Sequence, residues 1–345
     1  MNSRNKYVAN LSAAWAAHKA PRATDAPTVV SLFAGCGGSS LGYSMAGYDE
    51  RLAVEWDDAA AETFRLNFPG VSLHHGDIGS LPEADALRLA GLESGALDVL
   101  DGSPPCQGFS TAGKRNMDDS RNRLFLEYIR LLNAFRPKMF IMENVSGMVR
   151  GKMKLAFVEI LRELKGCGYL VSARVMDSMY FGVPQSRKRI IFVGARQDTN
   201  CAPTHPAPQT SPVGLADAVE LSVDALRGGW GARQFRSAQR RLAPLRLAPR
   251  RVSNGTGVVN RQFNNKFRGL DKPCVTLETG HPPILKLFGR EREMGLLECS
   301  LVGSFPPEFV WGRDAYARIG NSVPPLFMRA IATHVRGLLK VAHGA

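Results

Sequence analysis

The strongest constraint on the fold is an alternation of strand-like and helix-like segments along the first 196 residues. Short apolar runs recur there, and amphipathic stretches with helical spacing separate several of them. The runs that we predict to be strands are Val29–Phe33, Leu52–Glu55, Leu97–Asp101, Met139–Glu143, Leu170–Met176 and Arg189–Val193. The clearest helical segments are Leu124–Phe135 and Leu155–Leu164. This alternation predicts an α/β fold with a Rossmann-like, mostly parallel sheet flanked by helices, where ligands bind beyond the carboxyl ends of the strands.

The alternation breaks near Gln197, where a different part of the chain begins. Four prolines between Cys201 and Pro212 are typical of a linker. Apolar helical patterns resume near Met294 and again after Val323. We therefore predict three parts, which are an N-terminal, partly disordered tail at residues 1–26, a main domain at residues 27–196 that is completed by residues 286–345, and a smaller domain with its linker at residues 197–285.

Positive charge is concentrated in this smaller domain. Between Ala225 and Leu270 the chain has eleven Arg or Lys residues and no Asp or Glu. The aromatic residues interspersed there are Trp230, Phe235, Phe263 and Phe267. The whole chain carries 44 Lys and Arg against 31 Asp and Glu, a formal charge of +13, which favours a polyanionic partner through long-range attraction. Charge alone does not separate a nucleic-acid partner from a solubility device.

The six cysteines are widely spaced and form no C-x-x-C pair. Neither a zinc ribbon nor a disulfide framework is predicted, and we expect no metal site. This use of cysteine indicates a reducing compartment, so we expect a cytoplasmic protein, associated with the nucleoid if the source is prokaryotic. No apolar run reaches the ~18 residues that span a bilayer, so we expect no membrane partner.

The first predicted strand leads into a glycine-rich turn, Phe33-Ala34-Gly35-Cys36-Gly37-Gly38. Glycines let the backbone turn sharply and approach a ligand closely. The second strand ends at Glu55, about twenty residues beyond the glycines, where folds of this kind place a carboxylate on ribose hydroxyls. Asp77 supplies a further acid at a candidate strand end. Their order and spacing favour a nucleoside-containing cofactor.

The segment after the strand Leu97–Asp101 reads Gly102-Ser103-Pro104-Pro105-Cys106-Gln107-Gly108-Phe109-Ser110. Two prolines forbid helix and stiffen the backbone, so Cys106 is expected on a loop at the carboxyl edge of the sheet. Buried packing is the usual role of a free cysteine, but prolines and polar neighbours fit that role poorly. Cys106 is therefore a candidate nucleophile.

These motifs together resemble the DNA cytosine-5 methyltransferase family. The resemblance rests on Phe33–Gly38, Pro104–Gln107 and Glu143-Asn144-Val145, and further motifs follow in family order. Those are Asp119-Ser120-Arg121 with Leu124-Phe125, Gln185-Ser186-Arg187-Lys188-Arg189 and Gly320-Asn321-Ser322-Val323-Pro324. A later motif of the family appears only in altered form at Arg292–Glu298, with Gly295 and Leu297 at the unusual positions.

The resemblance implies a class I methyltransferase fold with a smaller target-recognition domain, and it implies residue roles. Cys106 would add to carbon 6 of a flipped cytosine, Glu143 would protonate ring nitrogen 3, and Arg189 would contact the carbonyl oxygen of the base. Arg187 would support the same pocket. The loop Gly108–Arg123 would close over the base, and the residues expected to bind the substrate are Gln107, Ser110 and Arg115.

The implied cofactor is S-adenosyl-L-methionine, the donor of the methyl group that carbon 5 receives. Phe33 and Trp56 would flank the adenine, Glu55 would hold the ribose, and Asp77 with Ile78 would approach the adenine edge. The C-terminal segment would fold back to close the pocket. The full set of expected cofactor residues is Phe33, Ala34, Gly35, Gly37, Gly38, Glu55, Trp56, Asp77, Ile78, Leu124, Asn321 and Val323.

The expected partner is double-stranded DNA, bound by a monomer, with a cognate restriction endonuclease acting separately. The nearest alternative is an RNA cytosine methyltransferase of the same fold, although Gln107-Gly108-Phe109-Ser110 resembles the DNA-type form. A catalytically silent DNA-binding protein is a second alternative, which the presence of Cys106, Glu143 and Arg189 disfavours. A nicotinamide oxidoreductase would explain the glycines but not Pro104–Gln107.

Overall fold

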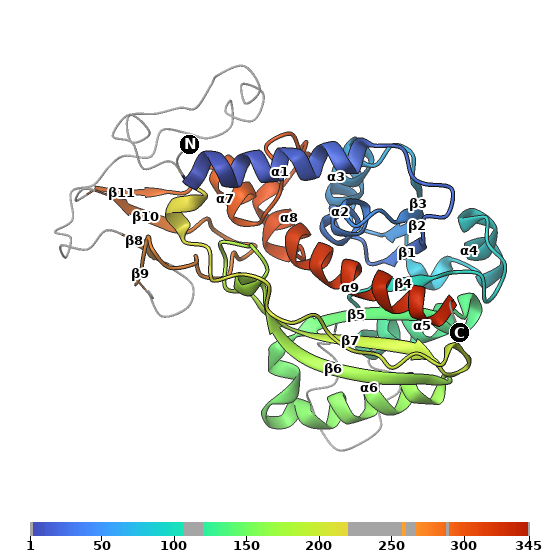
Figure 1. Ribbon diagram of the computed structural model, residues 1–345. Helices are drawn as coiled ribbons and strands as arrows, with labels where there is room; N and C mark the ends of the chain where they lie inside the picture. The colour runs from blue at the N-terminus through green and yellow to red at the C-terminus, as the bar shows by residue number, and fades with distance from the viewer. Residues whose placement is uncertain (1–2, 106–119, 220–256, 260–266, 288–289, 344–345) are drawn as a thin grey trace.

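A computed structural model describes residues 3–105, 120–219, 257–259, 267–287 and 290–343. Its centre is a seven-stranded sheet with the strand order β3-β2-β1-β4-β5-β7-β6 (Figure 1). Strands β1 to β5 run parallel, whereas β7 is antiparallel to both β5 and β6. The strands are β1 (Thr28–Leu32), β2 (Asp49–Glu55), β3 (Ser72–His75), β4 (Val99–Gly102), β5 (Met139–Val145), β6 (Tyr169–Asp177) and β7 (Lys188–Arg196). The expected Rossmann-like, mostly parallel sheet is confirmed.

The central strands read as continuous apolar runs because both of their faces are buried. In β5, Met139 and Ile141 join one hydrophobic cluster, and Phe140 with Met142 joins the cluster on the opposite face. Strand β3 was not among the predicted runs, although Asp77 was expected at a strand end. Its residues Ser72–His75 are polar or only partly buried at an edge of the sheet, so no apolar run marks it.

Helices cover both faces of the sheet and make three layers. Residues of α2 (Gly38–Met45) and α9 (Pro325–His343) belong to the core on one face, where α3 (Asp58–Asn67) packs alongside α2. Residues of α4 (Glu83–Ala90), α5 (Ser120–Phe135) and α6 (Lys154–Gly166) belong to the core on the other face. The short 3-10 segments that connect these elements are Ile78–Ser80, Ser146–Val149, Gly151–Met153, Ser178–Tyr180, Gln197–Thr199 and Leu215–Asp217.

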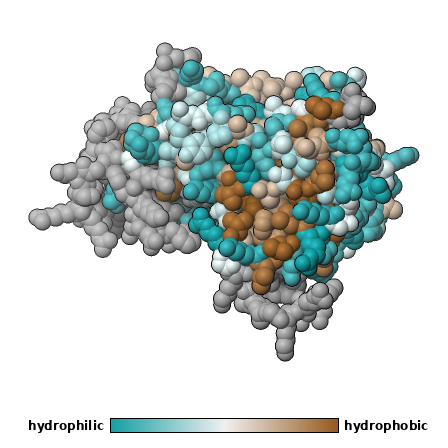
Figure 2. Space-filling model, turned by 60° about the horizontal axis from the view of Figure 1, so that its bottom comes forward, coloured by the Kyte–Doolittle hydropathy of each residue, from teal (hydrophilic) through white to brown (hydrophobic). Residues whose placement is uncertain are grey.

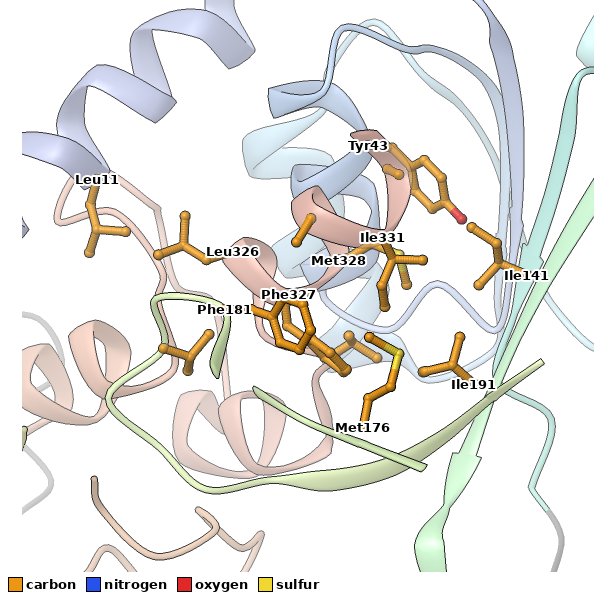
Figure 3. Packing of buried hydrophobic residues seen from close by; sticks show 14 of the residues in the cluster. Leu11, Tyr43, Ile141, Met176, Phe181, Ile191, Leu326, Phe327, Met328 and Ile331 are labelled. Carbon is orange, nitrogen blue, oxygen red and sulfur yellow. The ribbon is translucent and has the colours of Figure 1, made fainter. Parts of the chain in front are cut away.

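The C-terminal helix returns to the N-terminal half of the sheet and packs against α2. A Cβ built on Gly42 would lie 2.6 Å from the Cβ of Met328, so the close approach of these helices requires glycine at that position. The rings of Phe327 and Phe181 lie 5.3 Å apart in the same core, together with Ile331 (Figure 3). The last helix thus belongs to the same layered body as the first strands.

Residues 1–26 were expected to be a partly disordered tail, and this was wrong for most of the segment. Residues Ser3–Lys19 form helix α1, whose side chains Tyr7, Leu11 and Ala14 are buried. Tyr7 Oη donates a hydrogen bond of 2.8 Å to the carbonyl of Leu301 in α7 (Leu296–Val302). The buried side chains are spaced four and three residues apart and so lie on one face, but apolar residues such as Val8, Ala9 and Ala13 also occupy the other faces, so the sequence shows no distinct apolar face.

A second sheet forms where the smaller domain was expected. It is antiparallel, with the order β11-β10-β8-β9, and consists of β8 (Gly257–Val259), β9 (Phe267–Gly269), β10 (Ile284–Leu287) and β11 (Arg290–Glu293). It extends away from the layered body (Figure 1). The predicted boundary at residue 285 falls inside β10, because the hairpin pairing of β10 with β11 carries this sheet to Glu293.

The lower face of the main domain is partly apolar. In Figure 2, which brings the bottom of Figure 1 forward, hydrophobic surface gathers in a band bordered by hydrophilic residues. The exposed apolar side chains of α6 and of the edge strand β6 include Leu155, Val158, Leu170 and Val175. Within the described residues, no helix is long and apolar enough to cross a membrane.

Candidate active site

The candidate residues gather at one edge of the main sheet. The carboxyl ends of β1, β2, β4 and β5 meet there because these strands are parallel. Strand β7 runs in the opposite direction, so its first residues lie at the same edge, with Arg189 paired in register to Val145. Residues from five separate stretches of sequence therefore reach a common surface.

The glycine turn between β1 and α2 has an unusual backbone. Phe33, Gly35 and Gly37 have positive φ angles of 58°, 59° and 94°, a region that residues with a side chain rarely adopt. A Cβ on Gly35 would meet no atom within 4 Å, so this side of the turn faces open space. A Cβ on Gly37 would instead clash with the ring of Phe68, and one on Gly38 with Ser322. The three glycines therefore lie in different surroundings, with open space beside Gly35 and close packing at the other two.

Glu55 ties the end of β2 to this turn. Its Oε2 accepts a hydrogen bond of 2.7 Å from the backbone N–H of Gly35. Its Oε1 accepts bonds of 3.0 Å and 2.8 Å from the backbone N–H groups of Trp56 and Asp57. The carboxylate is largely buried, and after these bonds Oε2 retains a lone pair, whereas Oε1 already accepts two bonds. Glu55 is therefore held in place with acceptor capacity left for a ligand.

The other expected cofactor residues differ in their exposure. The Trp56 side chain is 76% exposed, Asn321 is also exposed, and Asp77 forms an exposed pair with Arg123, with 3.4 Å between Nη2 and Oδ2. The Ile78 side chain is buried in the core, so only its backbone can face a ligand. The remaining four are partly or fully buried, namely Phe33, Ala34, Leu124 and Val323.

Glu143 and Arg189 form an ion pair at the ends of β5 and β7. Arg189 Nε lies 2.7 Å from Glu143 Oε1, and the two side chains are 16% and 11% exposed. Arg189 Nη1 also donates to the carbonyl of Lys188 at 2.8 Å. The pair holds a carboxyl group and a planar donor group side by side, with limited access to water. A flat heterocycle with adjacent acceptor atoms matches that arrangement.

The loop that carries the candidate nucleophile is anchored by Asn144. Its side-chain Nδ2 donates a 3.0 Å hydrogen bond to the carbonyl of Pro104, and its Oδ1 accepts from the N–H of Val145 at 2.8 Å. Sequence reasoning quoted Asn144 as part of a motif but gave it no role. The predicted nucleophile Cys106, and with it Gln107, Ser110 and Arg115, lies outside the described residues.

Arg187 is buried, unlike its neighbour Arg189. Its Nη1 donates to the carbonyls of Gly320 at 2.9 Å and Leu277 at 3.4 Å, and its Nη2 donates to that of Asn321 at 3.3 Å. Burial, with a smaller contribution from the positive charge of Arg189, lowers the pKa of Arg187 to about 9. Arg187, directly before β7, therefore connects that strand to Gly320 and Asn321 of the C-terminal segment.

A second set of contacts joins the site to the chain that leads to the second sheet. Gln185 Oε1 accepts a 3.2 Å bond from the N–H of Leu277, and the N–H of Ser186 donates to the carbonyl of Cys274 at 2.9 Å. Thr276 Oγ1 donates to the carbonyl of Ser186 at 2.8 Å. These contacts link residues about ninety positions apart, so sequence spacing gave no sign of them.

Sequence reasoning also missed a buried acid beneath the loop. Asp101 is the third residue of β4, and its Oδ1 accepts a 3.1 Å hydrogen bond from Tyr43 Oη of α2. Burial, with a smaller contribution from the nearby carboxylates of Glu50 and Glu143, raises the pKa of Asp101 to about 8. Within the described residues, no cluster of His, Cys, Asp and Glu is arranged to hold a metal ion.

Comparison with known proteins identifies the family. The model of the C-5 cytosine-specific DNA methylase family matches residues 27–336. The chain belongs to this family. The type II methyltransferase M.DdeI of Desulfomicrobium norvegicum is 42% identical, over 89% of this chain and 88% of its own length. M.NgoPII of Neisseria gonorrhoeae is 30% identical, over 90% of this chain and 96% of its own. The chain is therefore an enzyme of the DNA methylase family.

Solved structures agree on the fold of this methylase. A prophage-encoded protein of E. coli assigned as a DNA modification methyltransferase superposes with a TM-score of 0.73 at 24% identity, covering 91% of this chain and all of that one. A DNMT2 structure from Spodoptera frugiperda gives 0.62 at 19% identity, covering 92% and 100%. At these identities the likeness shows the fold, which is the expected class I methyltransferase fold. Helix α1 precedes the region that the family model matches.

Proposed function

We propose that this methylase transfers a methyl group from S-adenosyl-L-methionine to carbon 5 of cytosine in a specific duplex DNA sequence. The observation that carries the proposal is the Glu143–Arg189 pair beside Asn144, which anchors Pro104 two residues before Cys106. The family and the printed names of its relatives support DNA as the substrate.

The glycine turn and its surroundings fit the proposed cofactor. Open space lies over Gly35, the Glu55 carboxylate has acceptor capacity for ribose hydroxyls, and the exposed Trp56 offers a ring face for the adenine. Asp77 and the backbone of Ile78 would hold the adenine edge, and Asn321 with Val323 would close the pocket. When bound, the cofactor supplies an electrophilic methyl group.

The protein must make carbon 5 of cytosine nucleophilic. In the proposed reaction the Cys106 thiolate adds to carbon 6, and the electron pair of the 5,6 double bond becomes available at carbon 5. Glu143 holds a proton at ring nitrogen 3, and Arg189 donates to the carbonyl oxygen, so that negative charge on the ring is relieved. After carbon 5 is methylated, water removes its proton, and the Cys106 sulfur leaves from carbon 6.

Access to these atoms requires a flipped base, because a cytosine inside a stacked duplex cannot reach a pocket at the edge of the sheet. Extrusion costs a few kcal/mol. We infer that the chain from Gly108 to the start of α5 at Ser120 closes over the flipped base, so the loop predicted to run to Arg123 ends earlier. We also infer that the smaller domain, residues 197–285 with the second sheet, reads the DNA sequence. We further propose that the enzyme acts as a monomer in the cytoplasm and that a cognate restriction endonuclease acts separately.

Covalent trapping tests the mechanism. The substrate is long duplex DNA of mixed sequence in which every cytosine is replaced by 5-fluorocytosine, so that the unknown recognition sequence is represented. Fluorine at carbon 5 cannot leave as a proton, so the covalent complex cannot resolve after methyl transfer. With S-adenosyl-L-methionine, the wild type should form an adduct that resists denaturing electrophoresis. Cys106→Ser should form none, whereas Cys167→Ser, which alters a free, partly exposed cysteine after α6, should form it normally. A Cys106→Ser protein that still forms the adduct would rule out the assignment.

A further inference from the structure

A ring of contacts around the proposed cofactor site includes Arg318, which has no role in the proposed reaction. Arg318 lies in α8 (Ala315–Asn321), and its side chain is 15% exposed. Its Nη1 donates to Asp57 Oδ1, directly after Glu55 and Trp56. The backbone carbonyl of the same arginine accepts a weak hydrogen bond of 3.8 Å from Cys36 Sγ in the glycine turn. One residue thus contacts both sides of the site.

The other half of the ring runs through Asp57 and Glu55. Asp57 is the N-cap of α3, where its Oδ1 also accepts from the N–H of Ala60 at 2.8 Å. The Asp57 N–H donates to Glu55 Oε1 at 2.8 Å, and Glu55 Oε2 accepts from Gly35 at 2.7 Å. Contacts therefore pass from the glycine turn through the end of β2 to α8 and back to the turn.

The ring fixes the C-terminal residues that would close the cofactor pocket. Asn321 follows Arg318 by three residues, and a Cβ on Gly38 would collide with Ser322 and the carbonyl of Val323. A shift of α8 away from Asp57 would therefore withdraw this segment from the turn. The Arg318–Asp57 pair is partly buried, so its attraction is less screened by water than that of a fully exposed pair.

We propose that Arg318 is a positioning residue for cofactor binding, which acts through its ion pair with Asp57 to hold Asn321 and Val323 over the glycine turn and Glu55. The inference rests on the proposed function, because it assigns the cofactor to this site. A matched control exists on the same side of the molecule. Arg313 pairs with Glu62 at 2.7 Å, also joining the C-terminal segment to α3, but its side chain is 67% exposed.

The test compares both arginines in the full-length protein. We expect Arg318→Ala to weaken the binding of S-adenosylhomocysteine, measured by titration calorimetry, by about tenfold, and Arg313→Ala to stay within about twofold of wild type. With unmethylated genomic DNA as a mixed substrate, Arg318→Ala should raise KM for S-adenosyl-L-methionine similarly. Its kcat at saturating cofactor should match wild type, because a positioning residue for binding leaves chemistry intact once the site is filled.

A double variant tests whether the pair acts as a unit. Asp57→Asn keeps an N-cap for α3 but removes the charge, and adding it to Arg318→Ala should weaken binding by less than about twofold more. If Arg318→Ala does not fold, the same binding and kinetic measurements are made on the single variants Arg318→Lys and Asp57→Asn. Wild-type affinity in Arg318→Ala, equal weakening in Arg313→Ala, or a fall in kcat at saturation would overturn the inference. A wild type that binds no S-adenosylhomocysteine would instead contradict the proposed function.

Discussion

Three buried ionisable side chains near the carboxyl edge of the sheet are each held in a different way. Asp101 accepts a hydrogen bond from Tyr43, Glu143 pairs with Arg189, and Arg187 donates to backbone carbonyls. Burial disfavours charge, which raises the pKa of Asp101 to about 8 and lowers that of Arg187 to about 9. Glu143 is held by an oppositely charged partner, whereas the partners of Asp101 and Arg187 are uncharged.

Asp101 predicts a pH dependence of stability. Because its carboxyl has a pKa of about 8 in the folded protein and an ordinary acidic pKa when unfolded, the unfolded chain binds fewer protons between these values. The free energy of unfolding should therefore fall as pH rises from about 5 to about 8. Asp101→Asn keeps an acceptor for Tyr43 and should flatten that fall by at least about 1.4 kcal/mol, the equivalent of one pKa unit.

Denaturant titrations at several pH values measure this effect. Asp85→Asn, at an exposed acid on α4, is the control and should follow the wild-type profile. Glu50 also has a pKa raised by burial, to about 7, so part of the wild-type slope should remain in Asp101→Asn. A slope in Asp101→Asn equal to that of the wild type would show that Asp101 does not stay protonated in the fold.

Variants at Glu55, Asp77 and Glu143 should separate effects on cofactor binding from effects on methyl transfer. Glu55→Ala removes the acceptor for three backbone N–H groups and the proposed ribose contact, so S-adenosylhomocysteine should bind at least about tenfold more weakly. Asp77→Ala should weaken it less, because that side chain is half exposed. Glu143→Gln should bind the cofactor normally but lose about a hundredfold or more in turnover. Unchanged affinity in both Ala variants, measured by calorimetry, would contradict the proposed pocket.

At the scale of elements, helix α1 stabilises the face of the sheet that α2 and α9 cover. Leu11 is fully buried in the same cluster as Phe327 and Met328 (Figure 3). At the end of the helix, His18 Nδ1 lies 2.6 Å from Ser44 Oγ, and its Nε2 lies 3.1 Å from the carbonyl of Asn67. Both ends of α1 are therefore fixed to the main domain, although the helix precedes the matched family region.

Truncating one buried side chain of α1 measures that contribution. Leu11→Ala leaves a cavity in the core and should lower the free energy of unfolding by about 2–5 kcal/mol. Asn10→Ala, at the neighbouring exposed position, should change it by less than about 0.5 kcal/mol. Guanidinium denaturation followed by circular dichroism gives both values. Equal stability of Leu11→Ala and wild type would mean that α1 does not pack on the core in solution.

At the scale of the whole molecule, the main domain and the approach to the second sheet are joined beside the site. Gln185 and Arg187 both contact Leu277, and Arg187 also holds Gly320 and Asn321. A Cβ on Gly320 would lie 2.5 Å from the backbone carbon of Glu278, so the two segments touch directly. Arg187 is therefore a buried contact common to three parts of the proposed enzyme. These are the base pocket, the segment that would close over the cofactor, and the approach to the recognition domain.

The basic segment between Ala225 and Leu270, most of which lies outside the described residues, should supply the DNA contacts. Alanine at a phosphate-contacting residue should weaken binding to all duplexes and reduce the log–log salt slope by about one. Alanine at a base-reading residue should cost about 1–3 kcal/mol on cognate DNA only. The positions to test are Arg233, Arg236, Arg240, Arg241, Arg246, Arg250, Arg251, Arg261 and Arg268.

Binding at several salt concentrations, on cognate and scrambled duplexes, sorts these variants into the two groups. Lys165→Ala removes an exposed positive charge at the end of α6, outside the segment, and should leave both affinity and salt slope unchanged. If every variant in the segment bound both duplexes like the wild type, the recognition role of the segment would have to be abandoned.

The sequence by itself determined the fold class and the family, because both are recorded in local patterns. A strand buried on both faces must be apolar throughout, as at Met139–Met142, and a sharp turn against a ligand needs glycine, as at Gly35. The N-terminal helix was predicted wrongly as a tail, because its apolar residues are spread around the helix and mark no single face. Which of them are buried depends on the contacts of α1 with α2 and with the 215–217 segment, which its own sequence does not record.

Only the tertiary structure decided how the site is held together. The Glu143–Arg189 and Arg318–Asp57 pairs, and the bonds from Arg187 to Gly320 and Asn321, join residues that are 46 to 261 positions apart in the chain. Side-chain partners at such distances depend on which strand ends meet at one edge and on where the C-terminal helices return. Those are properties of the packed layers, and no pattern within a single segment records them.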